Sequence, residues 1–349
     1  MKIVSWNVRG LGNDQTFREA QQLLREHRPK IMFLCETKLK VKQMQEKAKR
    51  LRYQNCFAVN REGLGGGLAL LWNEEVIVDI KSYSKHHVDA VVHSENGSYW
   101  RCTGVYGHPE SEKKKHTWEL LRRLAQLSSL PWLCVGDFNE VLSLNEKIGG
   151  KEKWVTEVNE FRRALRDCVL KDLGSCGYPF TWSNRRFGPH IIEEKLDRFL
   201  CNRKWGSFYQ EKAASNLTSW RSDHIPIMME VQEKGRGKGY LKRTYHRLHY
   251  EDMWSPYEKC KTIVKHEWKE QCCWNSSNPV ETFMKKSKEI LAELKTYCNG
   301  EFNGRKKKLE KLVNKLESMK KDYCHFESGD ELKRVENHID NILADEEIF

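Results

Sequence analysis

The sequence predicts an α/β (α+β) protein in which packed, mostly antiparallel sheets are flanked by helices and followed by a helical C-terminal extension. Up to residue 233, short apolar runs alternate with turns rich in Gly, Pro and Asn, which is typical of strands. Helical patterns occupy only some of the gaps between these runs, so neighbouring strands are expected to form hairpins. From residue 257 onward the chain is highly charged, poor in Gly and helical in its periodicity.

The individual elements follow from these patterns. Strand-like runs cover residues 2–6, 31–35, 68–72, 76–80, 88–93, 100–106, 132–136, 180–182, 196–200 and 227–231. The best helical patterns cover 14–27, 111–128 and 156–168. In the second of these, Trp118, Leu121 and Leu124 share one face, and Thr156 is expected to be the N-cap of the third.

The change in composition and periodicity after residue 233 predicts three segments. They are a folded domain at 1–233, a basic linker at 234–256 that begins with KGRGKG, and a charged helical extension at 257–349. In the extension, Leu309, Leu312, Leu316 and Met319 follow the spacing of a coiled-coil seam. The seam covers only about two heptads, so an amphipathic helical hairpin is the preferred interpretation, and self-association of these helices stays open.

Composition limits the class of protein. The 349 residues carry 61 Lys and Arg against 49 Asp and Glu, a formal net charge of +12, which favours an anionic partner such as nucleic acid. No apolar run approaches the roughly 18 residues that span a bilayer, and no secretory segment is recognisable, so we expect neither a membrane-spanning nor a secreted protein. The 12 Cys include no C-x-x-C pair, which indicates buried thiols rather than disulfides or zinc ligands.

Polar residues gather at the ends of the apolar runs, where a rigid sheet can present them to a cleft. They are Asn7, Glu36, Tyr106, Asp137, Asn139, Asp197, Asp223 and His224. Taken singly, each is better explained as part of an ordinary turn, but their ordered combination indicates a site. Carboxylate and carboxamide oxygens are the hard ligands that Mg²⁺ prefers, so the pattern is typical of a hydrolytic metal site.

The motifs around these residues, in chain order, are WNV at 6–8, CETK at 35–38, VYG at 105–107, GDFN at 136–139, LDR at 196–198 and SDHIP at 222–226. In this combination, residues 1 to about 231 resemble the endonuclease/exonuclease/phosphatase superfamily, and within it the endonuclease domain of plant non-LTR (LINE) retrotransposons. FTWSN at 180–184 and GGGLALLW at 65–72 are also similar to that subgroup. The resemblance implies a two-layer β-sandwich flanked by helices and a Mg²⁺-dependent enzyme that nicks double-stranded DNA, with Mn²⁺ as an alternative ion.

The resemblance also implies roles for the residues that face the phosphate. Glu36 would hold the catalytic Mg²⁺ with Asn7 beside it, Asp223 would support the metal site, and Tyr106 would steady the scissile phosphate. This assignment agrees with the chemistry, because a phosphodiester hydrolyses through a negatively charged transition state whose oxygens must face a metal and hydrogen-bond donors.

The remaining residues would carry the proton and the water. By the same resemblance, Asp137 and Asn139 would organise the attacking water, and His224 would donate a proton to a phosphate oxygen or polarise it. Asp197 would orient His224, since a carboxylate that accepts from one imidazole nitrogen fixes the tautomer and favours the charged ring.

Three cations are candidates for DNA contact. Many repair-enzyme relatives carry an acidic residue two positions after the first Asn, and here Arg9 stands there, which favours a nicking enzyme over a repair enzyme. Arg9 would neutralise part of the site charge or contact the DNA backbone. Arg185 and Arg186, next to Phe187, lie between two strand-like runs and are candidates for a hairpin that reads DNA shape in the minor groove. A solvated turn is the alternative for this segment.

Two other functions stay open. A phosphatase or phosphodiesterase of the same superfamily that acts on a non-DNA substrate would share the metal site, and a catalytically lost nucleic-acid-binding remnant would keep the fold and its basic surface. The sequence has no Asp-Asp pair for a polymerase metal site, so we expect a retroelement fragment with part of the connecting region but no reverse transcriptase. A DNA substrate implies that the protein acts in the nucleus. Without such a substrate we expect it in the cytoplasm.

Overall fold

The computed structural model describes residues 1–94, 97–186, 188–209, 211–232, 258–269, 279–321 and 330–347. The chain divides into two compact units, one formed by residues 1–236 and 320–331 and the other by 237–319 and 332–349. The predicted linker at 234–256 and Phe187 lie outside the described residues. Among the described helices, none has the length and apolar character required to cross a membrane.

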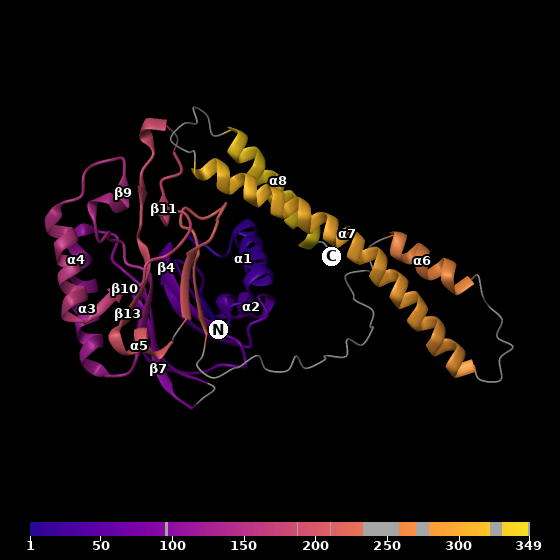
Figure 1. Ribbon diagram of the computed structural model, residues 1–349, viewed down its shortest axis with the longest axis horizontal. Helices are drawn as coiled ribbons and strands as arrows, with labels where there is room; N and C mark the ends of the chain where they lie inside the picture. Colours follow the sequence, from indigo (N-terminus) through magenta and orange to yellow (C-terminus); the bar gives the residue numbers. More distant parts are fainter. Residues whose placement is uncertain are drawn as a thin grey trace. The chain divides into compact units, whose positions relative to one another are not determined.

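Two six-stranded sheets form the core of the first unit (Figure 1). The first sheet has the order β14 (Glu211–Asn216), β15 (Ile227–Gln232), β1 (Lys2–Asn7), β2 (Ile31–Cys35), β4 (Gly65–Trp72) and β3 (Asn55–Glu62). The second has the order β10 (Leu170–Asp172), β13 (Asp197–Asn202), β8 (Trp132–Asp137), β7 (Tyr99–Tyr106), β6 (His87–His93) and β5 (Ile77–Ser84). The expected two-layer sandwich is therefore confirmed.

The two sheets pack on each other through one apolar cluster. It takes side chains from both sheets, among them Phe33, Leu70, Ala90 and Val135. A second cluster joins the first sheet to α1 (Asp14–His27) and α2 (Val41–Arg50), and a third joins the second sheet to α3 (Lys114–Leu127) and α4 (Val155–Asp167). The helices thus cover the two outer faces of the sandwich, as Figure 1 shows, and burial of these apolar surfaces is the main term that favours folding.

Short elements complete the first unit. They are α5 (Arg203–Phe208), the 3₁₀ turns η1 (Ser111–Lys113), η2 (Leu144–Glu146) and η3 (Gly188–His190), and a small antiparallel sheet of β11 (Trp182–Ser183), β12 (Glu193–Glu194) and β9 (Lys147–Ile148). An isolated bridge pairs Trp182 of β11 with His224. The small sheet is thereby tied to the segment that precedes β15.

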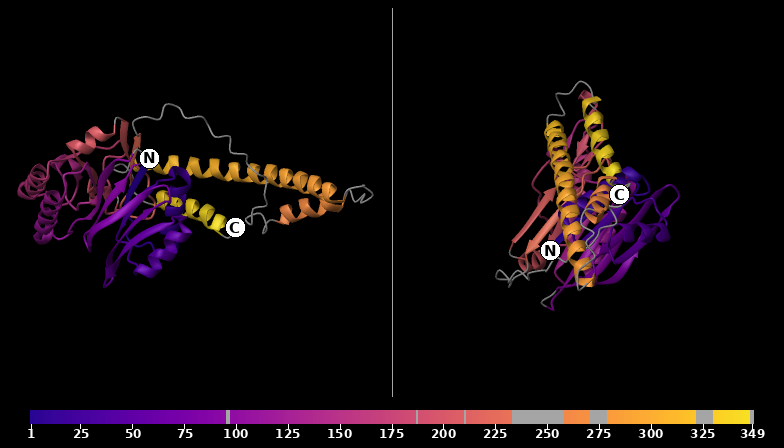
Figure 2. Two further views of the ribbon diagram at one scale, coloured as in Figure 1. Left: turned by 90° about the horizontal axis from the view of Figure 1, so that it is seen from below. Right: turned by 90° about the vertical axis from the view of Figure 1, so that its right-hand side faces the viewer.

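The described part of the second unit is helical, as the charge and periodicity of the extension predicted. It contains α6 (Glu258–Lys269), α7 (Pro279–Lys321) up to residue 319 and α8 (Asp330–Glu347) from residue 332 (Figure 2). Cys260 of α6 packs with Ile290 and Leu294 of α7. In the seam predicted on α7, Leu309, Leu316 and Met319 are buried and Leu312 is half-buried.

Two parallel strand pairs bring the candidate residues to one edge of the sandwich. β1 runs parallel to β2, with Asn7 in register with Cys35, and β7 runs parallel to β8, with Tyr106 in register with Asp137. Antiparallel β13 then places Asp197 opposite Asp137. Because the carboxyl ends of parallel strands meet at the same edge, residues that end different strands become neighbours.

Some elements differ from the sequence-based expectation. The strands β3, β10 and β14 and the helix α2 were not expected, and all three strands lie at the edges of their sheets. Edge strands are half-solvated and carry a weak apolar pattern, as the largely half-buried residues of β3 illustrate. Thr156 is not the N-cap of α4, which begins at Val155 after Trp154 and has no side-chain cap.

The contact between the sheets gives a direct test of the fold. A Cβ added at Gly104 of β7 would lie 2.2 Å from Cδ2 of Phe33 on β2, whereas one added at Gly65 of β4 would meet nothing within 4 Å. We expect Gly104→Ala to lower the free energy of unfolding by about 1–3 kcal/mol or more through overpacking. Gly65→Ala should stay within about 0.5 kcal/mol, and chemical denaturation followed by circular dichroism measures both. Equal stability of the two variants would contradict the packing described.

Candidate active site

A buried histidine–aspartate pair lies at the centre of the candidate site. Nδ1 of His224 donates to Oδ2 of Asp197 at 2.8 Å, and the two side chains are only 4% and 1% exposed. Burial disfavours the imidazolium, but the carboxylates of Asp197 and Asp137 outweigh it and raise the pKa of His224 to about 9. His224 is therefore a cation at neutral pH, and Asp197 sets the orientation of its ring.

The segment that carries His224 is held by bonds to β1. Ser222 Oγ donates to the carbonyl oxygen of Asn7 at 2.7 Å and accepts from the backbone N–H of His224 at 3.1 Å. The indole Nε1 of Trp6 donates to the carbonyl oxygen of His224 at 3.0 Å. These bonds are buried, so the position of the imidazole is fixed by strand β1 as well as by Asp197.

Asp137, the last residue of β8, lies beside the pair. Its Oδ2 accepts from Nδ2 of Asn7 at 3.0 Å and lies 3.7 Å from Nε2 of His224, while its Oδ1 accepts from the backbone N–H of Asn139 at 2.9 Å. Burial raises the pKa of Asp137 and the charge of Asp197 adds to the rise, whereas His224 opposes it. The result is a buried carboxylate whose proton affinity is higher than usual, in hydrogen-bond contact with the predicted metal-site residue Asn7.

Glu36 follows β2 and forms the other side of the site. Its Oε1 accepts from the hydroxyl of Tyr106 at 2.7 Å and from Nη1 of Arg9 at 2.8 Å, and lies 3.4 Å from Nδ2 of Asn7. Burial alone would raise the pKa of Glu36, but the donors Tyr106, Arg9 and Asn7 together lower it. Glu36 is therefore an ionised carboxylate that is almost fully covered.

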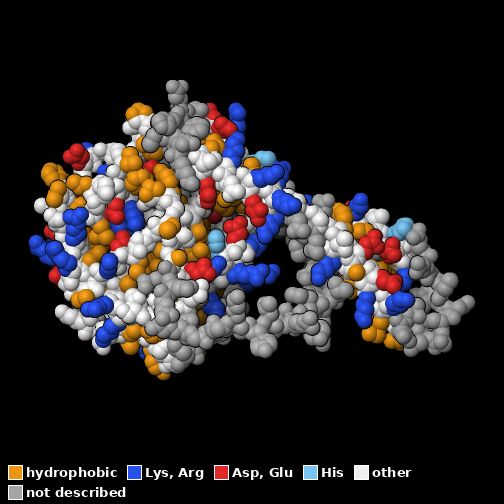
Figure 3. All heavy atoms as spheres, viewed as in Figure 1, with side chains coloured by type: hydrophobic (Ala, Val, Ile, Leu, Met, Phe, Trp, Pro, Cys, Tyr) orange, Lys and Arg blue, Asp and Glu red, His pale blue; other side chains and the backbone are white. Residues whose placement is uncertain are grey.

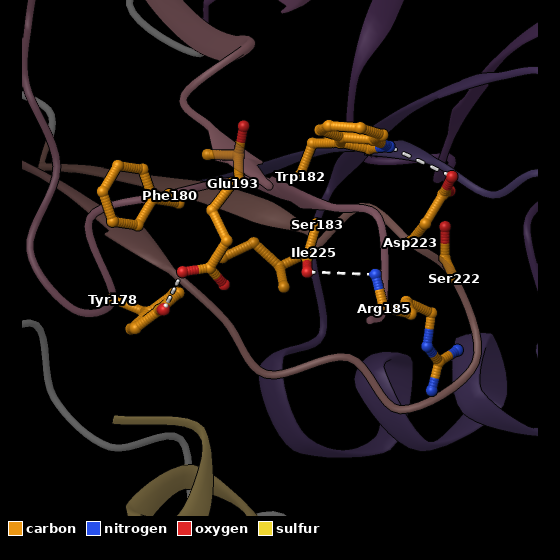
Figure 4. A pocket seen from close by; sticks show the side chains of 10 residues that line it. Tyr178, Phe180, Trp182, Ser183, Arg185, Glu193, Ser222, Asp223 and Ile225 are labelled. Carbon is orange, nitrogen blue, oxygen red and sulfur yellow. Dashed lines mark hydrogen bonds between the residues drawn. The ribbon is translucent and has the colours of Figure 1, made fainter. Parts of the chain in front are cut away.

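Arg9 lies between two of the predicted metal-site carboxylates. Its Nη1 is 2.8 and 2.9 Å from the two carboxylate oxygens of Glu36, and its Nε is 3.2 Å from Oδ1 of Asp223. Burial opposes the charge of Arg9, but Asp223 and Glu36 more than compensate and raise its pKa. The second oxygen of Asp223 accepts from the indole Nε1 of Trp182 at 3.1 Å (Figure 4).

The donor set suits a divalent cation. The site contains four carboxylates, those of Glu36, Asp137, Asp197 and Asp223. Its two cations are Arg9 and His224. With all six ionised, two negative charges are left over. Oδ1 of Asp197 is buried and accepts no hydrogen bond from the described residues. Excess negative charge on hard oxygen donors is what a metal such as Mg²⁺ requires.

Two groups could hold such an ion. One is the set that the resemblance implies: Asn7 lies 3.4 Å from Glu36, and the guanidinium of Arg9 bridges the carboxylates of Glu36 and Asp223. Within the described residues, the atoms of Asp137, Asp197 and His224 also lie within 4.8 Å of one another. The second group is less suited to a hard ion, because one of its three ligands would be an imidazole nitrogen and Mg²⁺ prefers oxygen.

A narrow pocket of about 40 Å³ adjoins Asp223 and is lined by both polar and aromatic side chains, the latter being Tyr178, Phe180 and Trp182 (Figure 4). Its volume is close to that of one water molecule. Arg185 borders it, but the guanidinium donates to the carbonyl oxygens of Trp220 and Arg221 at 2.8 and 2.7 Å. Arg185 lies in the hairpin of β11 and β12 (residues 182–194), here called the β11 hairpin, and ties it to the segment before His224. The side chain of its neighbour Arg186 is exposed.

A larger hollow of about 330 Å³ opens beside Tyr106. Four basic or imidazole side chains help to line it, namely Lys85, His86, His108 and Lys113. Lys85 is bonded to Glu62 at 3.1 Å and Lys113 to Glu110 at 3.2 Å, and all four of these groups are more than half exposed. Exposed ion pairs of this kind are weak, so both lysines can exchange their partner for another anion.

Several residues that position the site could not be identified from the sequence. Oγ1 of Thr181 accepts from the backbone N–H groups of Leu196 and Asp197, each at 2.9 Å. Glu19 of α1 accepts from the backbone N–H groups of residues 220 and 221 at 3.0 and 3.1 Å. The sequence separation of these pairs hides them, because only the folded chain brings Glu19 and Thr181 to the segments they support.

Comparison with known proteins places the chain in a family. Residues 4–224, more than half of the chain, match the endonuclease/exonuclease/phosphatase family. The chain belongs to this family. The match covers every predicted site residue, and the family assignment made from the WNV, GDFN and SDHIP motifs is thereby confirmed. No curated protein matches the chain.

Solved structures show the same fold. A 3′ phosphatase, NExo, from Neisseria, bound to a product DNA hairpin, is 19% identical, with a TM-score of 0.51 over 66% of this chain and 99% of its own. The endonuclease domain of TRAS1, a telomere-specific non-LTR retrotransposon, is 13% identical, with a TM-score of 0.52 over 67% and 99%. An AP endonuclease from Archaeoglobus fulgidus is 17% identical, with a TM-score of 0.53 over 66% and 99%. At these identities the likeness concerns the fold.

The support given by Thr181 can be tested by an isosteric change. Thr181→Val leaves the two backbone N–H groups at 196 and 197 without their acceptor, and we expect it to lower the free energy of unfolding by about 1–3 kcal/mol. Thr181→Ser keeps the hydroxyl and serves as the matched control, with a smaller loss from the missing methyl group. Urea denaturation of both variants measures the difference, and a valine variant as stable as the serine variant would refute this role.

Proposed function

We propose that the protein is a Mg²⁺-dependent phosphodiesterase that nicks double-stranded DNA and derives from a LINE-type retrotransposon. The observation that carries the proposal is the buried pair of His224 and Asp197 facing Asp137 and Asn7. Together with Glu36 and Tyr106, these side chains supply a proton donor, a base and an anchor for a phosphate within one edge of the sandwich. Family membership supports hydrolysis of a phosphoester. The DNA substrate, the metal and the retrotransposon origin are part of the proposal.

In this proposal His224 stabilises the charge that develops on a phosphate oxygen. Asp197 keeps Nδ1 protonated, so Nε2 is the nitrogen that donates to the substrate or transfers its proton to it. A pKa near 9 keeps the ring cationic at neutral pH. Asp197 acts as a positioning residue, since its 2.8 Å bond sets both the tautomer and the ring direction.

Asp137 is the proposed base for the attacking water. Burial raises its pKa and so brings its proton affinity closer to that needed for proton abstraction near neutral pH. Asn7 and the backbone N–H of Asn139 each donate to one oxygen of Asp137, which fixes the carboxylate plane. Water held by this carboxylate would attack in line with the leaving oxygen, and Asn139 would contact the transition state.

Glu36 and Asp223, with the carboxamide oxygen of Asn7, are the proposed ligands of Mg²⁺, and Mn²⁺ can replace it. The ion supplies Lewis-acid stabilisation of the phosphate charge when it is bound. The Tyr106 hydroxyl, now bonded to Glu36, is within reach of the same phosphate and would steady it. The excess of two negative charges supports a divalent ion at this edge, where Oδ1 of Asp197 also accepts no hydrogen bond from the described residues.

Three features favour DNA as the substrate over a small phosphoester. The hollow beside Tyr106 is lined by Lys85 and Lys113, whose exposed ion pairs with Glu62 and Glu110 can be exchanged for contacts with phosphates. Lys and Arg side chains are spread over the face of the first unit that Figure 3 shows, and the net charge is +12. Structures of the same fold include a DNA-bound phosphatase and a retrotransposon endonuclease domain. A DNA substrate would place the protein in the nucleus.

The nuclease assignment is tested by nicking of supercoiled plasmid. With Mg²⁺ we expect nicked circles from the wild type and none in EDTA, while His224→Ala and Asp137→Asn should each lower the rate about 10²–10⁴-fold. His116→Ala and Asp14→Asn, on exposed side chains, are matched controls that should retain the wild-type rate. Folded wild-type protein that binds DNA but never nicks it would favour a catalytically lost remnant. Hydrolysis of small phosphoesters alone would favour a phosphatase.

The DNA contact of the hairpin is tested through salt. Because Arg186 is exposed, we expect Arg186→Ala to weaken binding of duplex DNA and to reduce the slope of log K against log [salt] by about 1. Arg163→Ala, an exposed arginine on α4, should leave the slope unchanged. Fluorescence anisotropy at several salt concentrations gives both slopes. An unchanged slope in the Arg186 variant would assign this side chain to a solvated turn.

A further inference from the structure

The guanidinium of Arg9 occupies the space between the two carboxylates that are proposed to hold the metal. It contacts both oxygens of Glu36 at 2.8 and 2.9 Å through Nη1 and Oδ1 of Asp223 at 3.2 Å through Nε. These are the oxygens that a divalent cation at the same carboxylates would need. A cation is therefore already present in this site as part of the chain.

The surroundings leave the two carboxylates few other donors. Oε1 of Glu36 also accepts from Tyr106, and Oδ2 of Asp223 accepts from Trp182. The side chains of Glu36 and Asp223 are only 7% and 18% exposed, so without Arg9 two partly desolvated negative charges would face each other. Arg9 thus compensates the negative charge of both carboxylates.

Arg9 differs from these carboxylates in its access to solvent. Its side chain is 46% exposed, in contrast to the carboxylates it contacts. The backbone N–H of Arg9 donates to Oδ1 of Asn7 at 3.2 Å, so the main chain is anchored separately from the guanidinium. A rotation of the side chain alone would free Glu36 and Asp223 without disturbing the strand end.

We propose that Arg9 is a built-in counter-ion that competes with the divalent cation for Glu36 and Asp223, and that it transfers to a phosphate of the nucleic acid when the metal displaces it. The second part of this inference, the transfer of Arg9 to a phosphate, rests on the proposed function. The planar fork of arginine binds phosphate with the same paired geometry that it uses for carboxylate, so the displaced side chain has a matching anion in a bound DNA strand.

This exchange of partners by Arg9 couples the binding of the metal to the binding of DNA. In the absence of DNA, the metal must break three contacts of Arg9, and the guanidinium is left without its anions. A bound strand offers a replacement, so DNA should raise the affinity of the wild-type protein for the metal. Removing the guanidinium should tighten metal binding to the free protein and reduce the additional effect of DNA.

Calorimetric titration of the full-length, DNA-free protein with Mn²⁺ tests the competition. We expect Arg9→Gln to bind Mn²⁺ about tenfold more tightly than the wild type, and Arg9→Lys, which cannot reach both carboxylates with a planar fork, to fall between the two. Arg163→Gln removes one exposed positive charge elsewhere and should leave the affinity unchanged. Wild-type or weaker affinity in both Arg9 variants, or no Mn²⁺ binding by any of the proteins, would overturn the proposal.

Thermal unfolding provides a second measurement that does not depend on activity. In EDTA, Arg9→Gln should melt below the wild type because its carboxylates are uncompensated, and Mn²⁺ should raise its melting temperature by more than it raises that of the wild type. Equal responses to Mn²⁺ would contradict the competition. The plasmid assay distinguishes this inference from the proposed function. If the wild type nicks DNA but the Arg9 variants bind Mn²⁺ with wild-type affinity, the inference fails and the proposed function stands. If the Arg9 variants bind Mn²⁺ more tightly but the wild type does not nick DNA, the competition stands and the proposed function fails.

Discussion

Polar side chains from the two sheets meet in a buried seam at one edge of the sandwich, and they must satisfy one another there. Asn7 of the first sheet donates to Asp137 of the second, and His224, which precedes a strand of the first sheet, donates to Asp197 of the second. An unpaired partner at this depth would cost more than the bond itself contributes. The relative position of the sheets and the geometry of the candidate site are therefore one constraint.

Much of this site could be predicted from the sequence, because it is built at strand ends. Asn7, Tyr106 and Asp137 end apolar runs whose strand character was plain, and the parallel pairing of those runs then brings them together. Which partner each would contact could not be predicted, since it depends on register between strands far apart in the chain. Arg9 illustrates this limit, because its position two residues after Asn7 was clear while its bridge between Glu36 and Asp223 was not.

The weaker predictions concern residues whose role depends on distant contacts. The edge strands β3 and β14 have little apolar alternation of their own and exist because a neighbouring strand offers them bonds. The adjacent arginines of the β11 hairpin look equivalent in sequence, yet Arg185 holds two backbone carbonyl groups and Arg186 is exposed. Local sequence gives the same signal for an arginine that supports a loop and for one that meets solvent.

The position of β1 inside its sheet has a consequence for biosynthesis. β1 lies between β2 and β15, and its residues pair with Ile227 to Glu230, more than two hundred positions away. During translation the earliest strand must therefore wait, with one side of its backbone unpaired, until nearly the whole first unit has left the ribosome. His224 lies just ahead of that last strand, so the seam closes in the same late step that completes the sheet. A partly synthesised chain would accordingly have no assembled site.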